Sequence, residues 1–89
     1  MIVTWDEPKR RANIEAHGID LADAELFDWD NALIRPTTPD GHGRERFKAI
    51  GTLGDRVVTL IFSSLGSRAI SVISMRPAGT KERKLYVQQ

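Results

Sequence analysis

The sequence predicts an α+β fold with two N-terminal helices, an antiparallel β-sheet meander and a C-terminal helix. Two segments with helix-capping residues come first in the 89-residue chain, four segments rich in β-branched residues follow, and a segment that begins with proline comes last. Short connections between consecutive strands favour antiparallel neighbours. Because this length supports one hydrophobic core, we expect a single domain over residues 1–89.

The first helix follows a short β-rich start at residues 2–5. Asp6 is a good N-cap, Pro8 is tolerated in the first turn, and the pattern continues to about His17. Gly18 then allows a left-handed C-cap. His17 is either a cap residue that interacts with the helix dipole or a functional group.

A second short helix is predicted after Asp20, which is its N-cap. Its apolar stripe is formed by Leu21, Ala24 and Phe27. Three aromatic rings in this half of the chain are expected at the core or its edge rather than in base stacking, namely Trp5, Phe27 and Trp29.

The remaining elements alternate between strands and turns. Strands are predicted over residues 32–35, 44–50, 56–62 and 70–75, and the strongest loop signal is residues 36–43. Pro77 is expected in the first turn of the last helix. The predicted core includes Phe27, Phe47, Val58, Leu60, Ile70, Val72 and Ile73.

Composition excludes several classes of site. The chain has no cysteine and only two histidines, so neither a disulfide framework nor a thiolate or all-imidazole metal site is available. His42 lies between glycines without ligand-type neighbours at metal spacing, which indicates a solvated loop residue. We expect no metal and no cofactor. No apolar run is long enough to span a membrane and no leader is evident, so a cytoplasmic protein is expected.

Charge is distributed unevenly along the chain. Residues 1–40 have four Lys or Arg and nine Asp or Glu, whereas residues 41–89 have nine and three, which gives net charges of −5 and +6. Clustered cations are typical of proteins that bind polyanions, although unequal charge can also be a merely solvated surface. Arg44, Arg46 and Lys48 alternate on one strand face, where they could contact successive phosphates or face water.

The last third combines cations with groups that can handle protons. Arg76 follows the last strand, and Glu82, Arg83 and Tyr86 are three or four residues apart on the final helix. This spacing predicts a compact group. A solvated amphipathic helix is the alternative.

The order and spacing of residues along nearly the whole chain resemble the pattern of the BrnT family, which are small toxins of type II toxin–antitoxin pairs. They are Trp5-Asp6, Lys9, Asn13, His17-Gly18-Ile19, Phe27, Glu45-Arg46, Gly51, Ile73-Ser74, Arg76, Ala78, Glu82-Arg83 and Tyr86. The resemblance implies a RelE-like fold and ribonuclease activity on messenger RNA. It also implies a BrnA-type antitoxin whose dimeric ribbon-helix-helix part binds the promoter DNA.

Metal-independent RNA cleavage requires a deprotonated 2′-hydroxyl, a protonated 5′-oxygen and stabilisation of the phosphorane. Arg76 and Arg83, with Arg46 or Arg68, are candidates for the last task because arginine stays protonated. Glu82 is a candidate base, or else an ion-pair partner that positions an arginine, and the candidate acids are His17 and Tyr86. The candidate RNA-binding residues are Lys9, Arg44, Arg46, Lys48 and Arg68.

Three positions depart from the family pattern. Ala16, Leu65 and Ser71 stand where the family commonly has a basic residue, and each removes a cation from the expected RNA side. Arg68 could compensate for one of them. The alternative function is therefore a non-catalytic module with the same fold that acts as a co-repressor or RNA-binding protein, and a plain structural adaptor has no feature in its favour.

Overall fold

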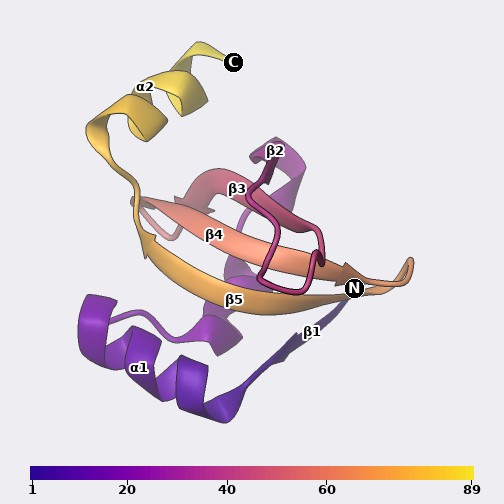
Figure 1. Ribbon diagram of the computed structural model, residues 1–89. Coiled ribbons are helices and arrows are strands. Elements are labelled where there is room, and N and C mark those ends of the chain that lie inside the picture. Colours follow the sequence, from indigo (N-terminus) through magenta and orange to yellow (C-terminus); the bar gives the residue numbers. More distant parts are fainter.

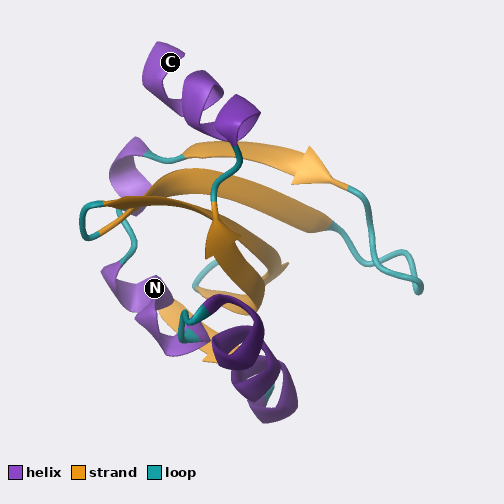
Figure 2. Ribbon diagram, turned by 90° about the vertical axis from the view of Figure 1, so that its left-hand side faces the viewer, coloured by secondary structure: helices purple, strands orange, loops and turns teal.

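The computed structural model describes residues 1–89 as a five-stranded mixed sheet with helices α1 (Glu7–His17) and α2 (Thr80–Gln88) on opposite sides (Figures 1 and 2). The elements are β1 (Ile2–Trp5), α1 (Glu7–His17), the 3₁₀ helices η1 (Leu21–Leu26) and η2 (Trp29–Asn31), β2 (Leu33–Thr37), β3 (Arg46–Leu53), β4 (Arg56–Leu65), β5 (Ala69–Pro77) and α2 (Thr80–Gln88). The strand order is β1-β5-β4-β3-β2. None of the helices has the length and apolar content needed to cross a bilayer.

The sheet combines a predicted meander with one parallel strand. Strands β2 to β5 pair antiparallel with their sequence neighbours, as predicted. The prediction of a wholly antiparallel sheet was wrong, because β1 pairs in parallel with β5, from Ile2 opposite Ala69 to Trp5 opposite Val72. This pairing covers part of the β5 edge and buries Val3 against the core.

The first helix has the predicted ends. The Asp6 carboxylate accepts a hydrogen bond from the Lys9 amide at 3.2 Å, and Gly18 adopts a φ of +69° at the C-cap. That left-handed conformation favours glycine because it has no Cβ.

The second predicted helix forms as the 3₁₀ helix η1, so only one of the two predicted N-terminal helices is an α-helix. Asp20 does cap this segment through the amide of Ala22. Its apolar residues Leu21, Ala24 and Phe27 recur every third position, which matches three residues per turn better than 3.6. All three are therefore buried on one side of η1.

Several strand ends differ from the prediction. β2 extends to Thr37 through Pro36, which an edge strand tolerates. β3 begins at Arg46, so Arg44 lies in the preceding loop rather than on the strand. Pro77 ends β5 instead of starting a helix, and Gly79 is the N-cap of α2.

The core lies between the sheet and the layer formed by α1 and η1. Of the predicted core residues, Phe27, Val58, Leu60, Ile70 and Val72 are buried, and Phe47 packs half-buried against them. Ile73 is only half-buried because the β4–β5 register shifts beside it, between Ile61 and Phe62. A Cβ at Gly51 would lie 2.7 Å from Cζ of Phe27, so this position requires glycine.

The aromatic rings anchor the edge of that core. Phe27 and Trp29 meet edge to face with their centroids 4.8 Å apart, and the Trp29 indole donates to the carbonyl of Ala24 at 2.9 Å. Trp5 also packs against the core. The structural interpretation of these rings is confirmed.

We predict that Leu60→Ala lowers the free energy of unfolding by about 2–5 kcal/mol, because the side chain is fully buried. The matched control is Leu26→Ala, since Leu26 is 74% exposed and its truncation should cost less than about 0.5 kcal/mol. Urea unfolding of both variants tests this. Equal losses in the two variants would contradict the described core.

Candidate functional site

Asn13 joins α1 to the part of β5 that β1 does not cover. Its side-chain oxygen accepts from the Met75 amide at 3.0 Å, and its side-chain nitrogen donates to the Met75 carbonyl and to the Ile19 carbonyl, both at 2.8 Å. The last β1 pair is Trp5 with Val72, so the amide group replaces a strand partner just beyond that point. Because Asn13 is buried, these bonds hold α1 firmly beside β5.

A groove of about 370 Å³ forms where α1 approaches the sheet. Lys9 and His17 lie four residues to either side of Asn13 and therefore on the same stripe of α1. Arg46 reaches the groove from β3, and the remaining lining residues are Ala12, Asn13, Ala16, Ile73 and Ser74. Two candidate residues of α1 and one from the distant strand β3 thus line one groove.

Arg46 has an unusual environment in this groove. Arg46 as a whole is half-buried, and its Nε atom is buried without any hydrogen-bond partner. A buried donor without a partner is costly, and such groups are rare in folded proteins. Neither Arg46 nor Lys9 nor His17 forms an ion pair in the structure. The groove therefore presents positive charge that no carboxylate neutralises, which suits an anion.

A second cluster centres on Glu82 and lies on the sheet face under α2. Arg76 donates to both carboxylate oxygens, at 2.8 and 3.0 Å, and Lys48 donates to one of them at 3.2 Å. The Thr59 hydroxyl and the Gly79 amide donate to the same carboxylate at 3.0 and 2.9 Å. Glu82 thereby links the N-terminus of α2 to β3, β4 and β5.

These contacts shift the pKa values of Glu82 and Arg76. The hydrogen bonds from Arg76, followed by those from Gly79, Thr59 and Lys48, hold the pKa of Glu82 far below its usual range, although burial opposes the shift. The same interaction raises the pKa of Arg76. A carboxylate held in this way is a poor proton acceptor near neutral pH. The geometry therefore favours the ion-pair interpretation of Glu82 over the general-base interpretation.

Ser74 connects the groove with this cluster. Ser74 lines the groove, and Arg76 follows it two positions later on the same strand. Residues two apart on a strand project from the same face about 7 Å apart. The groove and the Glu82 cluster therefore occupy neighbouring parts of one sheet face.

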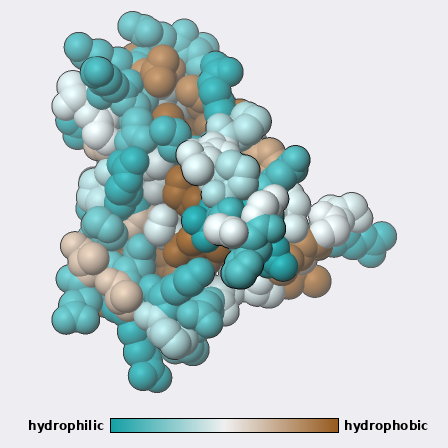
Figure 3. All heavy atoms as spheres, viewed as in Figure 1, coloured by the Kyte–Doolittle hydropathy of each residue, from teal (hydrophilic) through white to brown (hydrophobic).

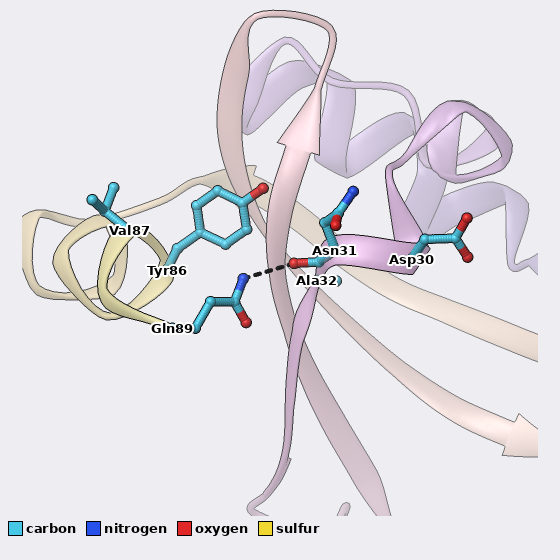
Figure 4. Close-up of a pocket in the computed structure, with 6 residues that line it drawn as sticks. All are labelled: Asp30, Asn31, Ala32, Tyr86, Val87 and Gln89. Carbon is cyan, nitrogen blue, oxygen red and sulfur yellow. Dashed lines mark hydrogen bonds between the residues drawn. The ribbon is translucent and has the colours of Figure 1, made fainter.

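The compact group expected on the last helix does not form. Glu82 turns towards the sheet, whereas Arg83 is exposed on α2. Tyr86 lies in a separate recess of about 510 Å³ between α2 and η2, where Gln89 donates to the Asn31 carbonyl at 2.7 Å (Figure 4). Two further candidates, Arg44 before β3 and Arg68 before β5, are exposed in loops.

Sequence reasoning did not identify Thr59 and Ser74 as site residues. Thr59 lies within the strand predicted over residues 56–62, and its fully buried hydroxyl requires a buried polar partner. Ser74 has no distinctive spacing. Its position depends on the β5 register shift, which the sequence does not reveal.

Two comparisons with known proteins gave a match. Residues 5–82 match the family model described as "Ribonuclease toxin, BrnT, of type II toxin-antitoxin system". The chain is also similar to the ribonuclease toxin BrnT of Brucella abortus, known from a 1.1 Å crystal structure, with 44% sequence identity and a TM-score of 0.73. That alignment covers 90% of this chain and 99% of the Brucella chain. A search of curated proteins returned no relative.

We predict that the Glu82 cluster makes stability depend on pH. Because the folded-state pKa of Glu82 is lowered, its stabilising contribution is present above the unfolded-state value of about 4.3 and is lost as the pH falls towards the folded-state value. Glu82→Gln should therefore lower the free energy of unfolding at pH 7 by about 1–3 kcal/mol and lose less stability than the unmodified chain below about pH 5.

The matched control is Glu25→Gln, because Glu25 is exposed and forms no ion pair. Denaturant unfolding of all three proteins between pH 2 and pH 7 measures the effect. Parallel pH curves for Glu82→Gln and the unmodified chain would show that the cluster does not stabilise the fold.

Proposed function

Because the chain belongs to the BrnT family of ribonuclease toxins from type II toxin–antitoxin systems, we propose that it cleaves messenger RNA in the groove beside α1. The observation that carries this proposal is Arg46, whose side chain lines a groove with Lys9 and His17 and whose buried Nε has no partner. An RNA phosphate supplies the opposite charge and, when the Arg46 side chain turns towards it, the missing acceptor.

The proposed roles follow from the chemistry of each side chain. Arg46 and Lys9 bind the scissile phosphate and stabilise the charge of the phosphorane. His17 transfers protons between the reacting oxygens, since it is the groove residue whose side chain can both accept and donate a proton. The 2′-oxygen attacks phosphorus as its proton leaves, and the 5′-oxygen takes up a proton as its bond to phosphorus breaks.

Arg76 acts at the border of this site. Its guanidinium donates two hydrogen bonds to Glu82. Arg76 is two residues beyond Ser74 on β5, so its charge lies on the same sheet face as the groove. We propose that Glu82 positions Arg76 and that Arg76 contacts the RNA backbone next to the scissile phosphate. Arg44, Lys48, Arg68, Arg83 and Tyr86 are proposed to contact the RNA farther from the cleaved bond.

The proposed reaction needs no metal ion. The groove is lined by Lys9 and Arg46, one imidazole, one amide, one hydroxyl and apolar side chains, with no carboxylate among the lining residues. Mg²⁺ is usually bound through carboxylate oxygens, so this lining opposes its binding. Cleavage is expected to continue in excess EDTA.

The remaining proposals concern partners and fold. A toxin of a type II system is paired with an antitoxin, and we propose a BrnA-type protein for this role. Operator DNA would be bound only through that antitoxin. We further propose that the α+β domain, over residues 1–89, is RelE-like.

A non-catalytic RNA-binding or co-repressor role is the second candidate. Ala16, where the family commonly has lysine, lines the groove itself, so the departure removes a cation from the proposed site. RNA binding without cleavage is the outcome that would favour this candidate.

We predict that Arg46→Lys lowers the rate of RNA cleavage about 100-fold, because lysine keeps the charge but loses the planar fork that contacts the phosphate. Arg83→Lys should cleave at nearly the original rate, since Arg83 is exposed on α2 and outside the groove. The measurement is cleavage of a labelled messenger RNA by purified protein, with growth arrest on expression as a second readout.

Circular dichroism and thermal unfolding serve as fold controls for both variants. A folded and fully active Arg46→Lys protein would contradict the proposed phosphate site. Loss of cleavage in Arg83→Lys alone would move the site to α2.

A further inference from the structure

A second groove, between α2 and the strands β2 and β3, combines apolar side chains with two cations. It has a volume of about 250 Å³ and is lined by Leu33, Arg35, Pro36, Thr37, Lys48, Ile50 and Leu85. Its apolar contribution comes from strands β2 and β3 and from α2, while its two cations project from neighbouring strands. Arg35 and Lys48 are direct partners in the β2–β3 register.

α2 contributes one exposed apolar side chain to this groove. Leu85 is 51% exposed, and no residue of α2 is buried. Figure 3 shows apolar side chains on α2 within a largely hydrophilic surface. Exposed apolar side chains beside a recess are typical of protein-binding surfaces.

We propose that this groove binds the antitoxin through an amphipathic helix that carries acidic side chains. Its apolar side chains would enter between Leu33, Ile50 and Leu85, and its carboxylates would pair with Arg35, which is exposed and forms no ion pair, and with Lys48. This inference rests on the proposed function, because the partner is the antitoxin of that system.

Two features of the groove favour a helical protein segment. Strand addition at β2 is disfavoured because Pro36 in this edge strand has no amide hydrogen to donate. RNA is disfavoured because Leu33, Ile50 and Leu85 give the groove an apolar lining, and because it has no ring on which a base could stack, whereas the groove beside α1 has that of His17. A helix can insert apolar side chains into the groove without pairing with the backbone of β2 and without stacking on a ring.

Lys48 connects this groove to the proposed RNA site. It lines the groove and also donates to Glu82, which binds Arg76. An antitoxin carboxylate that pairs with Lys48 would compete with Glu82 for this cation. Docking would thus act on the cluster that positions Arg76.

The test measures binding of the antitoxin, taken as the product of the adjacent open reading frame, to variants of the full chain by calorimetry. Leu85→Glu and Arg35→Glu should each weaken binding by at least about tenfold, through an unpaired charge in the apolar groove and through like-charge repulsion. The matched controls are Leu26→Glu and Arg56→Glu, at exposed positions outside the groove, and they should change affinity by less than about twofold.

RNA cleavage by the free variants separates the possible occupants. Both groove variants should retain full cleavage, because neither residue lies in the proposed active site. Circular dichroism confirms that the variants are folded. Unchanged antitoxin affinity would overturn the proposal, and so would a joint loss of antitoxin binding and RNA cleavage by a folded variant, which would identify RNA as the occupant. If the unmodified chain cleaves no RNA, the proposed function fails, but the affinity comparison still decides where the antitoxin binds.

Discussion

The geometry of this protein depends on the hydrogen bonds of one buried amide, that of Asn13. β5 needs a partner along the edge that β1 leaves uncovered, and Asn13 satisfies the amide and the carbonyl of Met75 at that point. A buried strand edge without such a partner would leave two backbone groups unpaired. The same contacts fix the rotation of α1, so Lys9 and His17 face the groove that Arg46 enters from β3.

A second constraint maintains the other side of the site. α2 has no buried residue. Glu82 attaches its N-terminus by accepting from donors on β3, β4, β5 and Gly79, and Gln89 attaches its other end to the Asn31 carbonyl. The ionised carboxylate orders Arg76 beside the groove. The groove that we assign to the antitoxin shares Lys48 with this cluster, so on these proposals one ion-pair network would connect RNA binding with neutralisation.

Local signals in the sequence predicted the elements that depend on neighbouring residues. Asp6 and Gly18 fixed the ends of α1, and the alternating strands gave the meander. The place of β1 could not be predicted, because its four residues carry no signal for the distant β5 edge. Lys9, His17 and Arg46 could likewise be chosen by their chemistry, but the groove that brings them together depends on the tertiary contacts of Asn13. The spacing on α2 wrongly suggested that Glu82, Arg83 and Tyr86 converge.

The central claim is that RNA binds through the orphaned guanidinium in the groove beside α1. The most direct measurement is NMR titration with a non-cleavable 2′-O-methyl oligonucleotide while the Arg46 Nε–H signal is observed. The account predicts a large shift of that signal on binding, together with shifts at Lys9 and His17. Binding that perturbs only α2 around Arg83 and Tyr86, with the Arg46 signal unchanged, would contradict it.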